Sequence, residues 1–330
     1  MPLSKTPLIT IIVPTYNRKE LLEKAILSVI NQKKDVPYDR ELIIVDDGSQ
    51  DDTKAYIQKY LDTYPQNIQY YYQDNTGVWS ARNKWLSHMS SSSDYVIFLD
   101  SDDELMPDCL SQCLGYINNL DQLQNSTTLW LYFLCIDEEG TVLWRKKMLQ
   151  WWTQRSFWYD DFLRGQIAVE MWFILRSYIF LQDPYLRFPE DVVTEGVIWS
   201  KMRKYMETKG LVITLRDYTG RLYRRNHSWY QQITKTVSSK RCLKNAQWGE
   251  QVLDYIGNDL LARKLTASYA DHCFRIGVNY VLAGEDTRGR FFLHKSLAHH
   301  IAIRTITVLC LSYVAKPMLR RIYAFYINHE

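Results

Sequence analysis

The first hundred residues alternate between short apolar stretches and amphipathic stretches, and this alternation limits the possible folds more than any other feature. The apolar stretches have the length of buried strands and lie at 8–14, 42–45, 68–72 and 95–99. Between them, apolar residues recur at helical spacing at 19–32, 51–64 and 79–89. Strands and helices in regular alternation predict a doubly wound α/β fold, with a mostly parallel sheet and helices on both of its faces.

Polar side chains follow each of the four expected strands. They form clusters at 15–18, 46–49, 73–77 and 100–103. The carboxyl ends of parallel strands meet at one edge of a sheet, and ligands bind beyond that edge. We therefore expect the four clusters to lie together and to form a binding site.

The fourth cluster is acidic, because the segment FLDSDDE at 98–104 brings four carboxylates to the end of an apolar strand. Like charges this close repel one another, and a divalent cation would remove that repulsion. Such cations take carboxylate oxygens together with substrate phosphates. Side chains alternate along an extended backbone, so we expect Asp100 and Asp102 on the same side and Asp103 elsewhere. The alternative is a solvated acidic loop or the start of a helix.

The sequence lacks the usual glycine-rich phosphate-binding motifs, G-x-x-x-x-G-K-[ST] and G-x-G-x-x-G. A P-loop kinase and a dinucleotide-dependent dehydrogenase are therefore poorly supported. A nucleotide on this sheet would be held by side chains and a metal ion. Asp46 or Asp47 could accept hydrogen bonds from a base or a ribose, and Arg82 could pair with phosphate oxygens.

Four motifs at these strand ends resemble family 2 glycosyltransferases of the GT-A fold: VPTYNR, VDDGSQDDT, NTGVWSARN and FLDSDD. The likeness covers about the first 110 residues. It implies an inverting transferase that uses a nucleotide-diphosphate sugar, commonly a UDP-sugar, with Mn²⁺ or Mg²⁺. It further implies that Asp102 is the main metal ligand and that Asp100 contacts the metal or the ribose. The residues expected at the nucleotide from the motifs and the strand-end clusters are Pro14, Thr15, Tyr16, Asn17, Arg18, Asp46, Asp47, Gly77, Arg82, Asp100, Ser101 and Asp102.

An inverting transfer needs a carboxylate that accepts the proton of the acceptor hydroxyl. Relatives carry this base in a Glu-Asp pair that follows a Phe-Pro-Glu triplet. In RFPEDVVTEGVIW, at 187–199, Glu195 and Gly196 stand at the positions of that pair. Glu195 is therefore the expected base and Asp191 the second candidate. The alternative is that Glu195 only stabilises the start of a helix.

The basic segment RLYRRNHSWY at 221–230 is a further candidate. In relatives an Arg or His of this region lies in a loop that closes on the diphosphate. Arg224, Arg225 and His227 are expected to offset the charge of the leaving group in this way. The alternative is a solvated basic strand end.

The second half of the chain predicts fewer and less regular strands. Segments 129–136 and 142–147 flank the hairpin sequence DEEG, and 171–175 and 211–215 are further expected strands. After about residue 240 the pattern is helical. We therefore expect a catalytic domain over 1–235, with a nucleotide-sugar half at about 1–110 and an acceptor half at about 111–235. Residues 236–330 would form a helical, basic, amphipathic region.

Charge is concentrated at the end of the chain, where residues 287–330 hold seven Lys or Arg and one acid. The charge-free run at 305–315 is too short to span a bilayer. An amphipathic basic segment of this kind is expected to lie on an anionic membrane surface, and packing on the body of the protein is the alternative. With no apolar signal segment seen, we expect a cytoplasmic protein at the inner face of the membrane. The net charge of +3 is too small to indicate nucleic-acid binding.

The basic C-terminal segment and the likeness to the family imply transfer of a sugar to a glycan on a lipid diphosphate, or to a related capsule, lipopolysaccharide or protein-glycosylation intermediate. A soluble acceptor is the rival. Two other classes remain open. One is a non-catalytic sugar-nucleotide binder, because Gly196 stands where an Asp is expected. The other is a nucleotidyltransferase, which also uses a metal on a doubly wound sheet.

Overall fold

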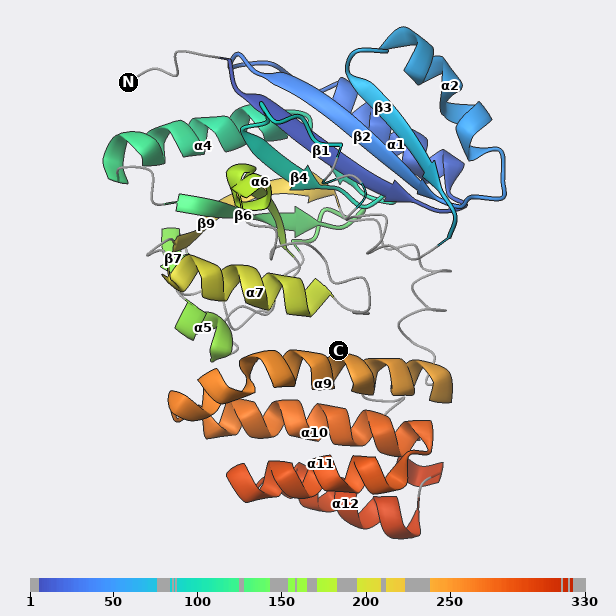
Figure 1. Cartoon of the computed structure of the whole chain (residues 1–330), viewed down its shortest axis with the longest axis vertical. Coiled ribbons are helices and arrows are strands. Elements are labelled where there is room, and N and C mark those ends of the chain that lie inside the picture. The colour runs from blue at the N-terminus through green and yellow to red at the C-terminus, as the bar shows by residue number, and fades with distance from the viewer. Residues whose placement is uncertain are drawn as a thin grey trace. The chain divides into compact units, whose positions relative to one another are not determined.

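Figure 1 shows the chain as a computed structural model. The structure describes residues 6–75, 84, 86, 88–124, 128–142, 154–157, 159–164, 171–182, 195–208, 212–222, 238–315, 317–319 and 321–322. The chain divides into two compact units. The α/β unit comprises Met1–Tyr159, Ile167–Glu190 and Met202–Arg225, and the helical unit comprises Asp160–Gln166, Asp191–Lys201 and Asn226–Glu330.

The alternation expected in the first hundred residues is confirmed where the structure describes it. The elements in order are β1 Leu8–Thr15, α1 Lys19–Ile30, β2 Asp39–Asp47, α2 Thr53–Thr63, β3 Ile68–Gln73 and β4 Tyr95–Phe98. Strand β1 pairs in parallel with β2 on one side and β4 on the other, and β2 pairs in parallel with β3. The helix expected at 79–89 lies mostly outside the described residues.

The strands that follow along the chain extend this sheet. The further elements are β5 Glu104–Leu105, α4 Cys109–Gln124, β6 Thr128–Ile136, β7 Gln154–Phe157, α5 Tyr159–Leu163, β8 Met171–Arg176, α6 Tyr178–Gln182, α7 Glu195–Thr208 and β9 Val212–Leu222. Helix α5 after its first residue, and α7 as far as Lys201, belong to the helical unit. The strand order is β3-β2-β1-β4-β8-β6-β9-β5, with β7 on β9. Among the described strands, β5, β7 and β8 run opposite to the other six. A mostly parallel α/β sheet is thus confirmed.

Two details of the expected second half are confirmed, and one strand is longer than expected. A bridge between Ile136 and Val142 closes the turn at 137–141, as the hairpin sequence predicts. Strand β8 covers the expected 171–175. Strand β9 begins near the expected 211–215 but continues to Leu222, so it reaches the start of the basic segment.

One hydrophobic core between the sheet and two helices holds β1 and β4 in place. Helix α1 has apolar residues at helical spacing, and its Leu22 and Ile26 are fully buried. They belong to the same buried cluster as Ile9 and Ile11 of β1 and several residues of α4. Helices α1 and α4 therefore cover one face of the sheet, and burial of this apolar surface holds β1 and β4 in place.

The helical unit contains α9 Ser239–Ala262, α10 Thr266–Ala283, α11 Asp286–His299 and α12 Ile303–Val314, as Figure 1 shows. Helices α10 and α11 approach closely at a glycine pair, because a Cβ on Gly277 would lie 2.9 Å from the carbonyl oxygen of Gly289. The helical C-terminal region is thus confirmed. Among the described helices, none combines the length and the apolar character needed to cross a bilayer.

Candidate active site

The carboxyl ends of β1, β2, β3 and β4 lie at one edge of the sheet. Thr15 at the end of β1 is in register with Asp46 of β2, and Asp46 is in register with Tyr72 of β3. On the other side of β1, the Leu99 N–H donates to the carbonyl of Ile12 at 2.9 Å and continues the pairing with β4. The expectation that the polar clusters share one edge is confirmed for those that the structure describes.

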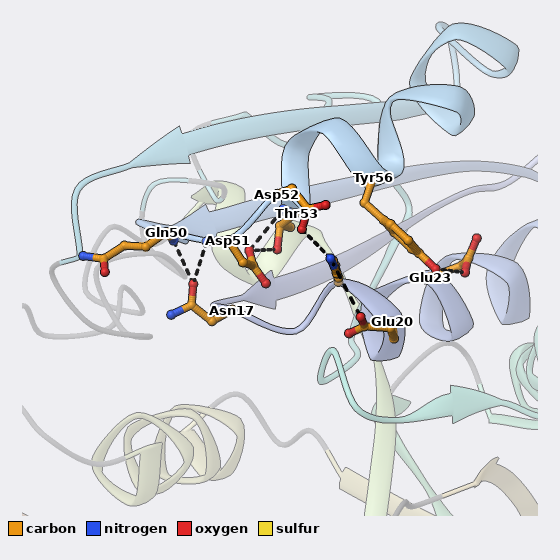
Figure 2. Close-up of polar contacts among 9 residues, drawn as sticks. Asn17, Glu20, Glu23, Gln50, Asp51, Asp52, Thr53 and Tyr56 are labelled. Atoms are coloured by element: carbon orange, nitrogen blue, oxygen red, sulfur yellow. Dashed lines mark hydrogen bonds and ion pairs between the residues drawn. The ribbon is translucent and has the colours of Figure 1, made fainter.

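The loop after β1 is tied to the loop after β2, as Figure 2 shows for Asn17. The Asn17 N–H donates to Ser49 Oγ at 2.9 Å, and Asn17 Oδ1 accepts the Gln50 N–H at 2.7 Å. Asn17 has a positive φ of 50°. Asn tolerates this left-handed conformation better than most residues, so it suits a tight turn of this kind. The polar residues after two neighbouring strands therefore form one connected unit.

Gly48 is a residue whose role the sequence analysis missed. Its φ is +84°, and a Cβ at this position would lie 2.7 Å from the backbone nitrogen of Asn75. A side chain would thus meet both an unfavourable backbone conformation and a steric clash. The glycine lets the chain after β3 approach the loop after β2. The signal was present in the sequence, since Gly48 follows two acids at a strand end.

Asp46 and Asp47 are buried and already have hydrogen-bond partners. Asp46 Oδ2 accepts the Tyr70 hydroxyl at 2.5 Å, and Asp46 Oδ1 accepts the Ser49 N–H at 2.7 Å. Burial and then the bond to Asp46 raise the pKa of Tyr70, so the phenol stays protonated and donates. Asp47 Oδ1 accepts Gln73 Nε2 at 2.7 Å. These carboxylates position the loop, and a carboxylate oxygen that accepts one hydrogen bond retains a lone pair for a ligand.

The acidic segment is a turn and not the extended chain that we expected. The Asp103 N–H donates to the Asp100 carbonyl at 3.0 Å. The alternation argument for Asp100 and Asp102 is therefore wrong, because β4 ends at Phe98 before these residues. The two carboxylates still interact, since the charge of Asp100 raises the pKa of Asp102. Asp103 is in the protein interior, with 1% of its surface exposed.

Asp102 forms an ion pair with Arg18, so the acidic turn is joined to the loop after β1. Arg18 Nη1 lies 2.9 Å from Asp102 Oδ2. Burial raises the pKa of Asp102, Arg18 opposes this effect, and Asp100 adds to it, with a net upward shift. An additional cation beside Asp102 would oppose the effect of burial and stabilise its ionised form.

This pair of carboxylates fits a Mg²⁺ or Mn²⁺ ion that also binds phosphate. Within the part of the chain that the structure describes, no three acids, histidines or cysteines converge on a metal position. Magnesium usually needs one or two protein carboxylates, because water and substrate phosphates supply its other ligands. Two carboxylates would therefore be enough for an ion that arrives with a diphosphate.

Asp103 and Arg221 form a buried ion pair that holds the acidic turn against β9. Arg221 Nη1 lies 3.1 Å from Asp103 Oδ2, and the two side chains are 6% and 1% exposed. Beside them, β5 pairs with β9 through Glu104 and Leu105. The sequence analysis missed Arg221, although it lies in the basic segment that we singled out at 221–230.

Thr15 provides a buried hydroxyl at the site edge. Its side chain is 4% exposed, and Oγ1 has no hydrogen-bond partner among the residues that the structure describes. A buried hydroxyl without a partner is costly, so a ligand that hydrogen-bonds to it would gain from the contact. Next to it, Tyr16 is 40% exposed.

The structure places only some of the other expected site residues. Pro14 is in register with Val45 at the end of β1, and Ser101 is buried in the acidic turn. Glu195 is the first residue of α7, and only its backbone is described. The expected site residues that lie outside the described part are Gly77, Arg82, Asp191, Arg224, Arg225 and His227.

Comparison with known proteins gives one family and several relatives. The model of Glycosyl transferase family 2 matches residues 10–172. The "GalNAc(5)-diNAcBac-PP-undecaprenol beta-1,3-glucosyltransferase" of Campylobacter jejuni is 27% identical over 325 residues, which are 96% of each chain. The "Minor teichoic acid biosynthesis protein GgaA" of Bacillus subtilis is 34% identical over 134 residues, which are 41% of this chain but 30% of that protein.

A solved structure shows the same fold over most of the chain. The crystal structure of S. aureus TarS 1-349 has a TM-score of 0.60, covers 97% of this chain and 87% of its own, and is 18% identical in sequence. This likeness agrees with the GT-A fold that the motifs predict, and at this identity it concerns the fold alone.

Proposed function

We propose, on the premise that residues 10–172 are a family 2 glycosyltransferase domain, that this transferase moves a sugar from a nucleotide-diphosphate donor to a hydroxyl group of a glycan. The observation that carries the proposal is the convergence of three strand-end loops. Asn17 binds Ser49, and Arg18 pairs with Asp102. Hydroxyl, amide, carboxylate and guanidinium groups thus lie together, as a ligand with a base, a ribose and phosphates requires.

The donor is proposed to be a UDP-sugar. TarS 1-349 has been crystallised in complex with UDP-GlcNAc, and that structure shares the fold of this chain with a TM-score of 0.59. In our assignment the buried carboxylates at the end of β2 and the Thr15 hydroxyl face the nucleoside, and the basic groups face the phosphates. The nucleotide site then comprises Pro14, Thr15, Tyr16, Asn17, Arg18, Asp46, Asp47, Gly77, Arg82, Asp100, Ser101 and Asp102.

A divalent cation, Mn²⁺ or Mg²⁺, would be held by Asp102 with Asp100 beside it. When bound, it would supply positive charge to the diphosphate as that group leaves. The protein's own basic groups would add to this effect. We assign Arg224, Arg225 and His227 to the same role, which rests on the likeness to the family.

The proposed reaction inverts the anomeric centre. The acceptor hydroxyl attacks the anomeric carbon, the bond from that carbon to the diphosphate oxygen breaks, and the nucleoside diphosphate leaves. The hydroxyl proton passes to a carboxylate. We assign this base to Glu195, with Asp191 as the second candidate. Glu195 begins α7, so its backbone is held at the start of a regular helix.

The acceptor is proposed to be a glycan on a lipid diphosphate. Support comes from the Campylobacter jejuni relative, which matches over 96% of both chains and whose name states an undecaprenol diphosphate substrate. Such an acceptor would place the reaction at the inner face of the cell membrane, with the protein bound peripherally from the cytoplasm. A related surface-polysaccharide intermediate that is linked to a lipid would place the reaction at the same membrane face.

The test is product analysis with purified full-length protein, Mn²⁺ and a panel of UDP-sugars. We expect release of UDP from one donor, and its loss with a chelator or in Asp102→Asn. Release of pyrophosphate would instead show nucleotidyl transfer. The Glu195→Gln variant should lose at least about 100-fold in turnover and keep its affinity for UDP, because a general base contributes at least that much. Unchanged turnover would remove Glu195 from the mechanism.

A further inference from the structure

Helix α12 has an unusual distribution of side chains, with small polar residues among those facing the protein and large apolar residues facing outward. Thr305 is 1% exposed and Ser312 is fully buried, whereas Ile303 and Val314 are each 83% exposed. Apolar residues normally occupy the buried face of such a helix, and isolated exposed ones need no explanation. Here they are not isolated.

The exposed apolar residues form a continuous stripe. Ile303, Ile306, Cys310 and Tyr313 are exposed and follow one another at intervals of three, four and three residues, which places them on one side of the helix. Further exposed apolar residues precede and follow α12 in the sequence. We name the surface formed by these side chains the α12 face, and its large members are Ile301, Ile303, Ile306, Tyr313, Val314, Met318 and Ile322.

Basic side chains border the α12 face. The Arg290 guanidinium lies 3.7 Å from the centre of the Tyr313 ring. Arg304 is 56% exposed, and its Nη2 forms an ion pair with Asp271 Oδ1 at 2.5 Å, which offsets part of its charge. Residues 287–330 as a whole contain seven Lys or Arg and one acid. An apolar stripe with basic flanks is the pattern of helices that lie in the headgroup region of a membrane.

Charge decides between the two obvious occupants of this face. A second copy of the chain would bring two strongly basic segments together, and like charges oppose that contact. An anionic lipid surface attracts the same basic residues while its acyl region accepts the apolar stripe. We propose that the α12 face binds the surface of an anionic bilayer, with Ile303 and Val314 inserted below the headgroups. This names the membrane contact that the proposed lipid-linked acceptor requires, and so rests on the proposed function.

The test measures binding of the full chain to vesicles of phosphatidylglycerol and phosphatidylcholine by sedimentation, with vesicles of phosphatidylcholine alone for comparison. The variant is Ile303→Glu with Val314→Glu. Both side chains are highly exposed, so the fold should survive, and circular dichroism checks this. We expect binding to anionic vesicles to fall at least about tenfold, because two apolar insertions are lost and two negative charges are added.

A matched control makes the same two kinds of change on the α/β unit. Tyr64→Glu with Val142→Glu replaces two exposed apolar residues, 37% and 39% exposed, and adds the same charge. We expect this variant to bind anionic vesicles within about twofold of the parent, since it leaves the basic segment and the α12 face intact. Equal binding by the α12 variant and the parent would overturn the proposal, and so would a parent that fails to bind anionic vesicles.

Two further readouts separate this proposal from other outcomes. Suppose that the parent is a dimer in sedimentation velocity, and that the α12 variant is a monomer that binds vesicles as well as the parent does. The face would then bind a second copy, and the proposal would be wrong. UDP release from the donor without membranes tests the proposed function alone. We expect the parent and the α12 variant to release UDP equally, so a loss of membrane binding is distinguishable from a loss of chemistry.

Discussion

At the residue scale, Arg18 and a divalent cation would compete for the same carboxylate. Arg18 Nη1 lies 2.9 Å from Asp102 Oδ2, with both side chains about three-quarters buried. We predict that Arg18→Gln binds Mn²⁺ more tightly when no nucleotide is present. A partly exposed ion pair contributes up to about 1 kcal/mol, so the gain should be about two- to fivefold. Titration of Mn²⁺ by electron paramagnetic resonance measures this affinity.

The neighbouring Lys19 provides the control for this prediction. Lys19 Nζ, at the start of α1, lies 2.5 Å from Oδ1 of Asp52, the residue before α2 that is labelled in Figure 2. Lys19→Gln removes the same charge one residue away without touching the acidic turn, so its Mn²⁺ affinity should match the parent. If Arg18→Gln binds Mn²⁺ no more tightly than Lys19→Gln, then Arg18 does not compete for the metal position.

The buried hydroxyl of Thr15 leads to a second prediction at this scale. Thr15→Val keeps the shape of the side chain and removes an oxygen that has no partner among the described residues. We expect the stability to stay equal or to rise, because a buried polar group without a partner is a cost. Affinity for UDP should fall about fivefold if the hydroxyl binds the nucleotide, since one hydrogen bond contributes about 1 kcal/mol. Thermal denaturation and calorimetry measure the two effects.

Thr10 on the same strand is the matched control. Its hydroxyl is fully buried and lies 2.5 Å from Glu41 Oε1 and 2.7 Å from Ser93 Oγ. Thr10→Val should therefore lose stability and keep its affinity for UDP, the reverse of Thr15→Val. If Thr15→Val instead loses stability and keeps its affinity for UDP, while Thr10→Val shows the reverse, then Thr15 has a purely structural role.

The sequence could predict which residues reach the site edge but not how they are paired. The position of Asp102 follows from the strand pattern. Its partner Arg18 is 84 residues away in the sequence. The ion pair of Asp103 with Arg221 depends on the antiparallel pairing of β5 with β9. Contacts of this kind arise from packing of distant segments, which local periodicity does not encode.

At the element scale, α1 and α2 are joined by one carboxylate. Glu23 of α1 accepts hydrogen bonds from Lys59, Tyr60 and Tyr56 of α2, at 2.7, 2.6 and 2.9 Å. These bonds lower the pKa of Glu23 from 4.5 to about 2. Because the folded pKa is the lower one, the stabilisation is complete above pH 4.5 and is lost as the pH falls toward 2.

We predict that Glu23→Gln lowers the free energy of unfolding by about 1 kcal/mol at neutral pH, a value kept small by solvent screening. The difference from the parent should narrow on acidification below pH 4.5. Urea denaturation at several pH values measures both effects. Glu20→Gln on the same helix is the control, because that residue is largely exposed and should show neither effect. A difference independent of pH would contradict the assignment.

The buried pair of Asp103 and Arg221 gives the second prediction for elements. Arg221→Leu removes the cation of a buried ion pair while Asp103 stays in place, a change that costs about 3–5 kcal/mol. We expect a large loss of stability in urea denaturation, and recovery of most of it when Asp103→Leu is added. A loss below about 1 kcal/mol in the single variant would show that the turn at 100–103 does not depend on this pair.

Helices and strands were predictable from the sequence where the local spacing of apolar residues determines them. Helix α1 follows from Leu22, Ala25, Ile26 and Val29, and these side chains are all buried. Strand β9 was foreseen only at its start, because its later part, RDYTGRL, has little apolar alternation and is held by pairing with β6. Tertiary pairing thus extended a strand that propensity alone would have ended.

At the scale of the whole molecule, charge is separated along the chain. Residues 287–330 hold seven of the 40 basic residues and one of the 37 acids. The preceding 286 residues therefore hold 33 basic and 36 acidic residues and have a net charge of −3, although the whole chain has +3. An anionic surface would attract the C-terminal segment, whereas the small net negative charge of the preceding residues would oppose binding.

This separation predicts how membrane binding depends on salt. The Debye length falls from about 10 Å at 0.1 M to about 3 Å at 1 M ionic strength, so the charge contribution should weaken strongly over this range. The apolar contribution of Ile303 and Val314 does not depend on charge screening. We therefore expect affinity for anionic vesicles to fall at least about tenfold with added salt and then to level off above zero. Cosedimentation over a salt series measures this curve. Binding that is insensitive to salt would mean that the basic residues take no part, and binding that vanishes would mean that the apolar stripe does not insert.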